Sequence, residues 1–436
     1  MRRRTPAAWA APALLVALIG SVAPGTPAGI ARAADGEGVT PVPQGNGACT
    51  FPMKQQIKER PWALQRIVFD RLWQDTKGRI AHGRPIRVAV IDTGVDNTNP
   101  QLADAVDTTH GWDFLHNAKN AGDEAAGDPK APTDGTYDPV GHGTKVAGII
   151  AARPRAGTGF VGLAPEATII PLRQNDEKGS GNAATLAQAI RKAIAAGADI
   201  INISQDTTKP LSHNSDLAAA VKEARHHDIV VVASAGNDGL DGRLKDTYPA
   251  SYGGVLAVAS SDRNNERAPF SQSGAFIGVA APGVDMVSTV PKGGQCVDNG
   301  TSFSAPYVAG VAALLKAKHP DWKEYQIVAQ IEQTAERTVN GRDPFVGWGV
   351  VDPVRALTED AHPIDRPTAD GGLAKATPPD PLTWPDGESP QERRDRYATY
   401  GLGAGGVAVA VIAGTAVVWR DARKRGAGSR TPRVNE

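Results

Sequence analysis

The sequence predicts an α/β fold in which helices cover both faces of a mainly parallel β-sheet, followed by one C-terminal transmembrane helix. The first observation is that short apolar runs, rich in β-branched residues, alternate with segments whose apolar residues recur at helical spacing. This alternation favours a parallel sheet, because each crossover helix packs back onto the sheet. The second observation is an uncharged stretch, Gly401–Trp419, near the end of the chain.

The composition is typical of a large globular domain with tails. Hydrophobic residues make up 41% of the 436 residues, which is ample for a sizeable core. The chain carries 47 Lys and Arg against 47 Asp and Glu. This balance gives no electrostatic reason to bind nucleic acid, and we expect no nucleic-acid partner. The spacing of cysteine and histidine suggests no zinc site, and we expect neither a metal nor another cofactor.

Residues 1–34 are interpreted as a secretory signal peptide. The basic Arg2–Arg4 precede the largely apolar Ala7–Val22, and Ala31–Ala33 forms a small-x-small cleavage site. The alternative is an uncleaved membrane anchor. The signal places the main domain outside the cytosol.

Residues 35–60 are expected to form an N-terminal extension, rich in glycine, proline and polar residues, that is not a domain of its own. The extension contains Cys49, and the other cysteine of the chain is Cys296. A single cysteine pair in an exported protein favours a disulfide, so we expect Cys49 to be joined to Cys296. In the chain-entropy model, closing so long a loop stabilises the fold by about 4–5 kcal/mol.

The strands of the predicted domain, residues 61–358, are short apolar runs. Arg87–Ile91, for example, is a β-branched run typical of a buried parallel strand. The strands are expected at Arg87–Ile91, Ala167–Leu172, Asp199–Ile203, Ile229–Ala233, Val255–Ala259 and Phe276–Ala280.

The helices are expected between and after these strands. Ala183–Ala196 has its apolar residues at helical spacing. Residues 107–139 have no clear period and are rich in Gly, Asp, Asn and Pro, so they are expected to form a long surface loop. The expected helices are Phe69–Trp73, Val146–Ala151, Ala183–Ala196, Leu217–Ala224, Ser302–Lys318 and Glu324–Ala335.

A linker and a membrane segment are expected after the domain. Residues 359–399 are rich in proline and charge, as in an extended linker. Residues 400–419 are interpreted as a transmembrane helix, since the uncharged stretch spans roughly 28 Å at about 1.5 Å per residue, close to the ~30 Å bilayer core. The basic tail, residues 420–436, is expected to be cytoplasmic. The alternative is a soluble apolar helix.

The stretch Asn299–Gly310 places a serine at the start of a helix. Gly300 permits a tight turn and Pro306 fits the first turn of a helix, so Ser302 is expected at or just before the helix N-terminus. There its amide N–H is free and the helix dipole favours negative charge. Ser302 is therefore a candidate nucleophile that also helps to hold an oxyanion. The alternative is that it only caps the helix.

Three further polar residues lie beside strands or helices. Asp92 ends a strand, at the edge where open α/β sheets bind ligands. Asn237 follows another strand, and His142, between two glycines, precedes a helix. Nucleophilic serine catalysis needs a base, a carboxylate that orients it and donors for the oxyanion. The alternatives are that His142 is a turn residue and Asn237 an Asx-turn residue.

Three motifs carry a resemblance to a known family. Asp92-Thr93-Gly94, Gly141-His142-Gly143-Thr144 and Gly300–Pro306, in this order, resemble the subtilisin family of serine proteases, the subtilases. The resemblance covers about Pro61–Leu357 and includes Gly347–Asp352, which is similar to the family's closing segment. It implies a subtilisin-like fold and an acyl-enzyme mechanism.

The resemblance also implies a role for each matched residue. Ser302 would be the nucleophile, His142 the general base and then the general acid, and Asp92 the carboxylate that orients His142. The side-chain amide of Asn237 and the Ser302 N–H would form the oxyanion hole. The implied substrate-binding residues are Ser204, Gln205 and Asp206 on a peptide-pairing edge strand, and Ser234, Ala235 and Gly236 in the primary specificity pocket.

The chain departs from the family pattern in three places. Residues 35–60 are too few for the family's folding pro-domain. We therefore expect the extension to wrap the domain, pinned close to Ser302 by the Cys49–Cys296 bridge. Phe303 stands where many relatives have methionine and is not open to the same oxidation. Asp206 stands where many have glycine, so we do not expect the family's specificity to carry over.

The order of signal peptide, short cysteine-bearing extension, subtilase domain, Pro-rich linker and single C-terminal helix resembles the mycosins, membrane-anchored subtilases of type VII secretion. The resemblance implies a single-pass protein of the cell membrane with an extracytoplasmic catalytic domain. It implies a secreted protein or peptide as substrate, and type VII secretion membrane components as partners that the chain stabilises. The alternatives are a mainly structural subunit of the secretion machine and a membrane-tethered subtilase unrelated to secretion.

Overall fold

The structure is a computed structural model that describes residues 38–39, 49, 51–53, 56–116, 131–176, 178–179, 181–212, 214–369 and 389–426. The chain divides into two compact units, Met1–Gly371 and Gly372–Glu436. The expected signal peptide, residues 1–34, and the end of the basic tail lie outside the described residues.

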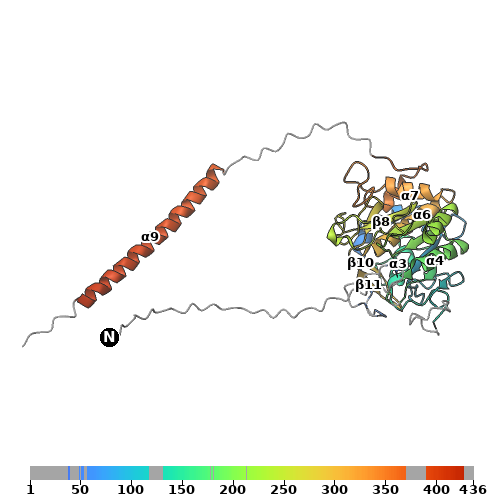
Figure 1. Cartoon of the computed structure of the whole chain (residues 1–436), viewed down its shortest axis with the longest axis horizontal. Coiled ribbons are helices and arrows are strands. Elements are labelled where there is room, and N and C mark those ends of the chain that lie inside the picture. Colours follow the sequence, from blue (N-terminus) through green and yellow to red (C-terminus); the bar gives the residue numbers. More distant parts are fainter. Residues whose placement is uncertain are drawn as a thin grey trace, which may run out of the picture. The chain divides into compact units, whose positions relative to one another are not determined.

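A seven-stranded sheet forms the centre of the first unit (Figure 1). Its strands are β2 (Arg87–Asp92), β3 (Trp112–Asp113), β4 (Thr168–Arg173), β6 (Ile200–Ile203), β7 (Val230–Ser234), β8 (Val255–Ser261) and β9 (Ile277–Pro282). Their order is β3-β4-β2-β6-β7-β8-β9, and every neighbouring pair is parallel. The six predicted strands and the parallel sheet are confirmed, and β3 adds an edge that the sequence does not predict.

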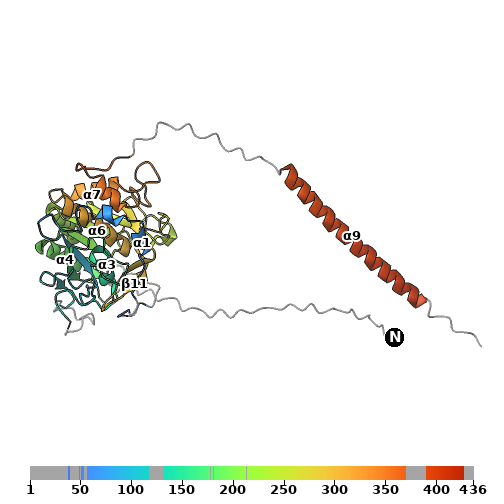
Figure 2. The same cartoon turned by 180° about the vertical axis from the view of Figure 1, so that it is seen from behind.

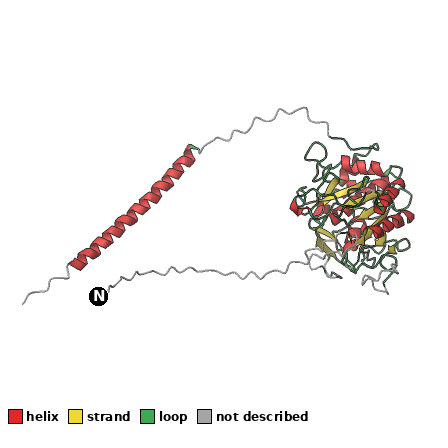
Figure 3. Ribbon diagram, viewed as in Figure 1, coloured by secondary structure: helices red, strands yellow, loops and turns green. Residues whose placement is uncertain are grey.

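Helices cover both faces of the sheet, as the sequence predicts (Figures 2 and 3). The long helices are α3 (His142–Ala151), α4 (Ala183–Ala195), α5 (Asp216–His226) and α6 (Thr301–Lys318). α3 and α6 share a core with Val88 of β2, whereas α4 and α5 share a second core with the next residue, Ala89. Successive strand residues point to opposite faces, so one apolar run supplies both cores.

The first unit has further helices. They are α1 (Trp62–Gln65), α2 (Phe69–Leu72), the 3₁₀ helix η1 (Gly239–Asp241), α7 (Glu324–Gln333) and α8 (Pro353–Thr358). α8 begins where it does because the Asp352 side chain accepts hydrogen bonds from the amides of Val354 and Arg355, and Pro353 occupies the first position.

Two small antiparallel pairs lie outside the sheet. They are β10 (Met286–Thr289) with β11 (Gln295–Asp298), and β1 (Gly38–Val39) with β5 (Gly181–Asn182). The predicted disulfide is confirmed, because Cys49 of the extension is bonded to Cys296 of β11, with their Cα atoms 6.1 Å apart. The Met53 amide also donates to the Gly293 carbonyl at 3.1 Å, so the extension follows the β10–β11 hairpin.

Residues 107–139 are only partly the surface loop that the sequence predicts. Residues 117–130 lie outside the described part, but Asp113, in β3, is fully buried and its Oδ2 pairs with Arg173 Nη1 at 2.8 Å. Asp138 is also buried. The expectation is wrong for these two aspartates because each carboxylate is satisfied by buried donors, which composition alone does not reveal.

The second unit contains one long helix, α9 (Pro390–Gly426). Within the described residues it is the one helix long and apolar enough to cross a membrane, with a mean hydropathy of 2.0 in its most apolar window. It begins inside the segment expected to be a linker, residues 359–399. Part of that segment belongs to the first unit, where the Thr368 amide donates to Gln333 Oε1 at 2.6 Å.

Candidate active site

Asp92 and His142 form a buried hydrogen-bonded pair. Asp92 is the last residue of β2 and His142 the first residue of α3. Asp92 Oδ1 lies 2.7 Å from His142 Nδ1 and also accepts the Thr93 amide at 2.7 Å. The two side chains are almost inaccessible to solvent, so water does not compete for this bond. The carboxylate therefore holds the imidazole in one orientation.

Glycine geometry sets the start of α3. Gly141, at the N-cap, has φ +79°, a left-handed conformation that favours glycine. A side chain on Gly143 would collide with the carbonyl oxygen of Gly94. The glycines flanking His142 thus allow the turn after Asp92 to touch the first turn of α3. The sequence places His142 before the helix, whereas the structure places it in the first turn.

Asp138 ties the loop of Asp92 to the helix of His142. Its Oδ1 accepts hydrogen bonds from Thr93 Oγ1 at 2.8 Å and from the Gly141 amide at 2.7 Å. Its Oδ2 accepts the Thr144 amide at 2.9 Å and Thr144 Oγ1 at 2.5 Å. Burial raises the pKa of Asp138, and these hydrogen bonds act in the opposite direction. Sequence reasoning missed Asp138; its signal is an aspartate shortly before a helix N-terminus.

Ser302 lies in the first turn of α6, inside the helix and not ahead of it. Its hydroxyl donates to the Ser204 carbonyl at 3.1 Å, and the Ser204 hydroxyl donates to the Ser302 carbonyl at 2.9 Å. Pro306 lies inside α6, so the expectation that it occupies the first turn is wrong. Because Pro306 has no N–H for the Ser302 carbonyl, the Ser204 hydroxyl supplies the missing donor.

Asn237 is fixed beside the start of α6. Its Oδ1 accepts the Thr301 amide at 2.9 Å and Thr301 Oγ1 at 3.1 Å. These bonds orient the side chain so that Nδ2 remains as a donor without a hydrogen-bond partner among the described residues. The amide N–H of Ser302, in the first helical turn, has no intrahelical acceptor either. Two candidate oxyanion donors therefore lie near each other.

His142 lies beside the helix that bears Ser302, but the two residues share no direct hydrogen bond in this structure. The ring of Phe303, the residue after Ser302, lies 5.3 Å from the His142 ring, centroid to centroid. His142 Nε2 is buried and has no hydrogen-bond partner among the residues described. The Ser302 hydroxyl is turned toward Ser204 instead. Bonds between nucleophile and base are often absent or long without substrate.

The candidate substrate edge runs along the ends of β6 and β7. Ser204, Gln205 and Asp206 follow β6, and the Asp206 carboxylate lies against the Cα of Gly236, just beyond Ser234 and Ala235. The Gly236 amide donates to Thr301 Oγ1 at 3.2 Å, which joins this segment to α6. The structure thus brings the predicted specificity residues of both strands to one place.

An extended segment of the chain itself pairs with β5. Gly38 lies opposite Asn182 and Val39 opposite Gly181 in an antiparallel register. β5 therefore has an edge that accepts a strand. Phe51, also in the extension, packs its ring against Gly141, immediately before His142. Phe51 thus brings the extension against the turn that precedes His142.

A buried ion pair lies close to the candidate site and joins α3 to β11. Lys145 Nζ, in α3, lies 2.6 Å from Asp298 Oδ2, at the end of β11. The ammonium also lies 5.9 Å from the ring centroid of Phe303. Sequence reasoning missed this pair, because a lysine after Gly-His-Gly-Thr carries no local signal of a partner far along the chain. The pair thus joins α3, which carries His142, to β11, which carries Cys296. Through Phe303 it also contacts α6, which carries Ser302.

No group of three or more His, Cys, Asp or Glu side chains in the described part of the chain is arranged to hold a metal ion.

Comparison with known sequences finds relatives of one class. The model of the Subtilase family matches residues 83–349. Thermitase from Thermoactinomyces vulgaris is 36% identical over 306 residues, covering 70% of this chain and 99% of thermitase. A thermophilic serine proteinase from Bacillus sp. (strain AK1) is 37% identical over 297 residues, covering 67% of this chain and 66% of that protein. The chain thus spans about two thirds of the Bacillus protein.

Comparison with solved structures finds similar folds. The crystal structure of MycP1 from Mycobacterium smegmatis has a TM-score of 0.61 and 29% identity, covering 79% of this chain and 95% of MycP1. The structure of the MycP3 protease from the type VII (ESX-3) secretion system has a TM-score of 0.59 and 30% identity, covering 70% of this chain and 91% of MycP3.

Proposed function

The chain belongs to the subtilase family of serine endopeptidases, and we propose that it is a membrane-anchored, extracytoplasmic endopeptidase of a type VII secretion system. The observation that carries the catalytic part is the buried 2.7 Å bond between Asp92 Oδ1 and His142 Nδ1. It lies beside the helix that bears Ser302, since Phe303 packs against the His142 ring.

The proposed chemistry begins with the orientation of His142. With its Nδ1 proton directed at Asp92, the neutral imidazole has its lone pair on Nε2. Ser302 turns its hydroxyl from the Ser204 carbonyl to Nε2, gives up its proton and bonds to the carbonyl carbon of the peptide. His142 then passes the proton to the leaving amine, and an acyl-enzyme remains. Water, deprotonated by His142, releases the acyl group and regenerates Ser302.

The oxyanion that forms in this step needs donors held in place beforehand. The Asn237 Nδ2 and the Ser302 amide are proposed to supply them. The two bonds that Asn237 Oδ1 accepts from Thr301 support this role, because they orient the amide without using Nδ2. Loss of one such donor typically lowers kcat about 10²–10³-fold.

The substrate is proposed to be an extended peptide. It would pair with Ser204, Gln205 and Asp206, and its primary side chain would enter the pocket beside Ser234, Ala235 and Gly236. The contact of the Asp206 carboxylate with Gly236 supports this arrangement, because it brings the two segments together.

The membrane orientation and the secretion partners are proposed from α9 and from the similar solved structures. The basic Arg423–Arg425 at the end of α9 favour a cytoplasmic C-terminus, which leaves the catalytic unit on the outer side. MycP3 is a protease from a type VII secretion system, and its likeness to this chain supports a secreted substrate and association with type VII membrane components.

A second candidate function is a mainly structural subunit of the secretion machine. One observation favours it, namely that the Ser302 hydroxyl is bonded to the Ser204 carbonyl and not to His142. The two functions differ in whether export depends on Ser302.

A comparison of secreted-protein termini tests the proposal. Strains would carry the intact chain, a deletion, or Ser302→Ala. We expect at least one secreted protein to lose its processed terminus equally in the deletion and in Ser302→Ala. Identical termini in the intact and Ser302→Ala strains, with export lost only in the deletion, would establish the structural role instead.

A further inference from the structure

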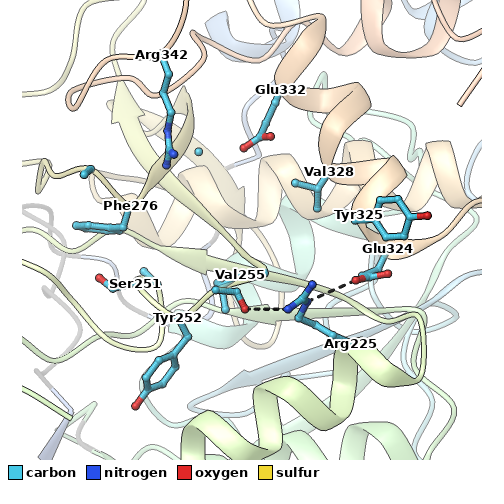
Figure 4. Close-up of a pocket in the computed structure, with 15 residues that line it drawn as sticks. Arg225, Ser251, Tyr252, Val255, Phe276, Glu324, Tyr325, Val328, Glu332 and Arg342 are labelled. Atoms are coloured by element: carbon cyan, nitrogen blue, oxygen red, sulfur yellow. Dashed lines mark hydrogen bonds and ion pairs between the residues drawn. The ribbon is translucent and has the colours of Figure 1, made fainter. Parts of the chain in front are cut away.

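A pocket of about 310 Å³ lies at the sheet edge opposite the candidate active site (Figure 4). It opens beside Val255, the first residue of β8, and Phe276, just before β9. Asp92 and Ser234, by contrast, are the last residues of β2 and β7. Since all these strands are parallel, the pocket lies where the strands begin and the candidate active site lies where they end. A molecule in this pocket does not compete with a peptide at Ser302.

One face of α7 forms a wall of the pocket. Glu324, Val328 and Glu332 follow one another at helical spacing and therefore share that face. Glu324 and Glu332 are about 12 Å apart along the helix axis at about 1.5 Å per residue. The stretch between them is apolar, because Val328 lies between the two glutamates on this face and Phe276 also lines the pocket (Figure 4). The pocket is thus polar at both ends and apolar in the middle.

The charges at one end of the pocket are already matched. Arg225 Nε lies 3.5 Å from Glu324 Oε1, and Arg225 Nη1 donates to the Gly253 carbonyl at 3.3 Å. Glu324 is buried. This end needs no further counter-ion.

The charges at the other end are not matched within the described chain. The Glu332 carboxyl group accepts no hydrogen bond and forms no ion pair with a described residue, and burial raises its pKa to about 7 against the opposing charges of Arg342 and Arg337. Arg342 uses Nε to donate to the Ile277 carbonyl at 2.8 Å, and its terminal nitrogens have no partner among the described residues. Figure 4 places the Glu332 carboxyl and the Arg342 guanidinium on the same side of the pocket, separated by a gap.

These features define a complementary ligand. A lone cation would be attracted by Glu332 but repelled by Arg342. A lone anion would be attracted by Arg342 but repelled by Glu332. A ligand that carries an ammonium and a carboxylate on the same carbon atom satisfies both groups. We propose that the pocket binds a free α-amino acid with an apolar side chain. Its ammonium would bind Glu332, its carboxylate Arg342, and its side chain would lie between Val328 and Phe276. The pocket is at the small end of known ligand sites, roughly 300–1,000 Å³, as a single amino acid requires.

Calorimetric titration of the full-length protein in detergent micelles tests the ligand chemistry. L-Leucine and L-phenylalanine are the probes, and N-acetyl-L-leucine and L-leucinamide each lack one of the two charges. We expect saturable binding of at least one free amino acid, and binding at least about 10-fold weaker for both derivatives. Absence of saturable binding by both amino acids, or equal affinity for either derivative, overturns the proposal.

Variants test the residues. Glu332→Gln and Arg342→Gln should each weaken binding by at least about 10-fold. Asp321→Asn, an exposed charge outside the pocket, should bind as the intact protein does. Ser302→Ala should also bind normally, which separates this site from the proposed peptidase chemistry. Unchanged binding by folded Glu332→Gln contradicts the proposal. If that variant does not fold, the titrations of the intact protein with N-acetyl-L-leucine and L-leucinamide still test the proposal.

Discussion

Ser204 and Ser302 are joined by two reciprocal hydrogen bonds, each hydroxyl donating to the other residue's carbonyl, at 2.9 Å from Ser204 and 3.1 Å from Ser302. The bond from Ser204 replaces a helical bond that Pro306 cannot make. The bond from Ser302 must break before the hydroxyl can reach His142. Ser204, the residue that follows β6, therefore anchors the helix and holds the proposed nucleophile in its resting position.

Ser204→Ala should lower the free energy of unfolding by about 1–3 kcal/mol, because the Ser302 carbonyl is then buried without a donor. It should also lower kcat about 10-fold through misplacement of Ser302. Pro306→Ala in the same chain restores an N–H to that carbonyl and should recover stability. Denaturant unfolding and peptide hydrolysis are the measurements. No recovery in the double variant would contradict the proposed replacement.

Asp138→Asn should reduce kcat/KM by about 10–100-fold, because an amide nitrogen cannot accept the Thr144 or Gly141 hydrogen bonds that align Asp92 with His142. The pH profile of kcat/KM should shift as well, since the environment of His142 changes. The matched control is Asp134→Asn, which loses bonds to Thr136 in the same loop but none to the site. Equal losses in both variants would mean that Asp138 acts only on stability.

Reduction of the Cys49–Cys296 bond should lower the thermal midpoint, with a loss of about 2–5 kcal/mol in stability. The extension is then held by weaker contacts, such as the Met53–Gly293 hydrogen bond. Calorimetry with and without dithiothreitol measures the change. The Cys49→Ser/Cys296→Ser double variant should melt at the lower temperature in both conditions. A double variant as stable as the oxidised protein would show that the bridge contributes little.

Glu332→Gln should change the pH dependence of stability. The Glu332 pKa is about 7 in the fold against 4.5 for an ordinary glutamate, so the folded state holds the extra proton between these values. The carboxyl group thus destabilises the fold increasingly as pH rises from about 4.5 to 7. The glutamine variant should be more stable than the intact protein by about 1–3 kcal/mol at pH 8 and equal at pH 4. A pH-independent difference would contradict the raised pKa.

Much of the fold was predictable because it rests on local pattern. The β-branched runs identify β2 and its parallel neighbours, and the polar residue that ends a strand identifies Asp92. The two cysteines, in a chain whose sequence predicts export, identify the bridge. These features depend on periodicity, composition or chain order, which the sequence carries directly.

The remaining features depend on contacts between distant segments. β3 has two residues and no period, so only its pairing with β4 defines it. Pro306 by propensity favours the first turn of a helix. It is tolerated further along α6 because the Ser204 hydroxyl donates to the Ser302 carbonyl. Asp138 and Lys145 look like surface charges until their partners are placed around them. The Glu332 pocket likewise has no sequence motif.

The most direct test of the account is mass spectrometry of the folded protein after reaction with a fluorophosphonate. We predict one adduct, on Ser302, that is absent in Ser302→Ala and forms much more slowly in His142→Ala. An adduct on another residue, or none on folded protein, would contradict the assignment of Ser302 as the nucleophile.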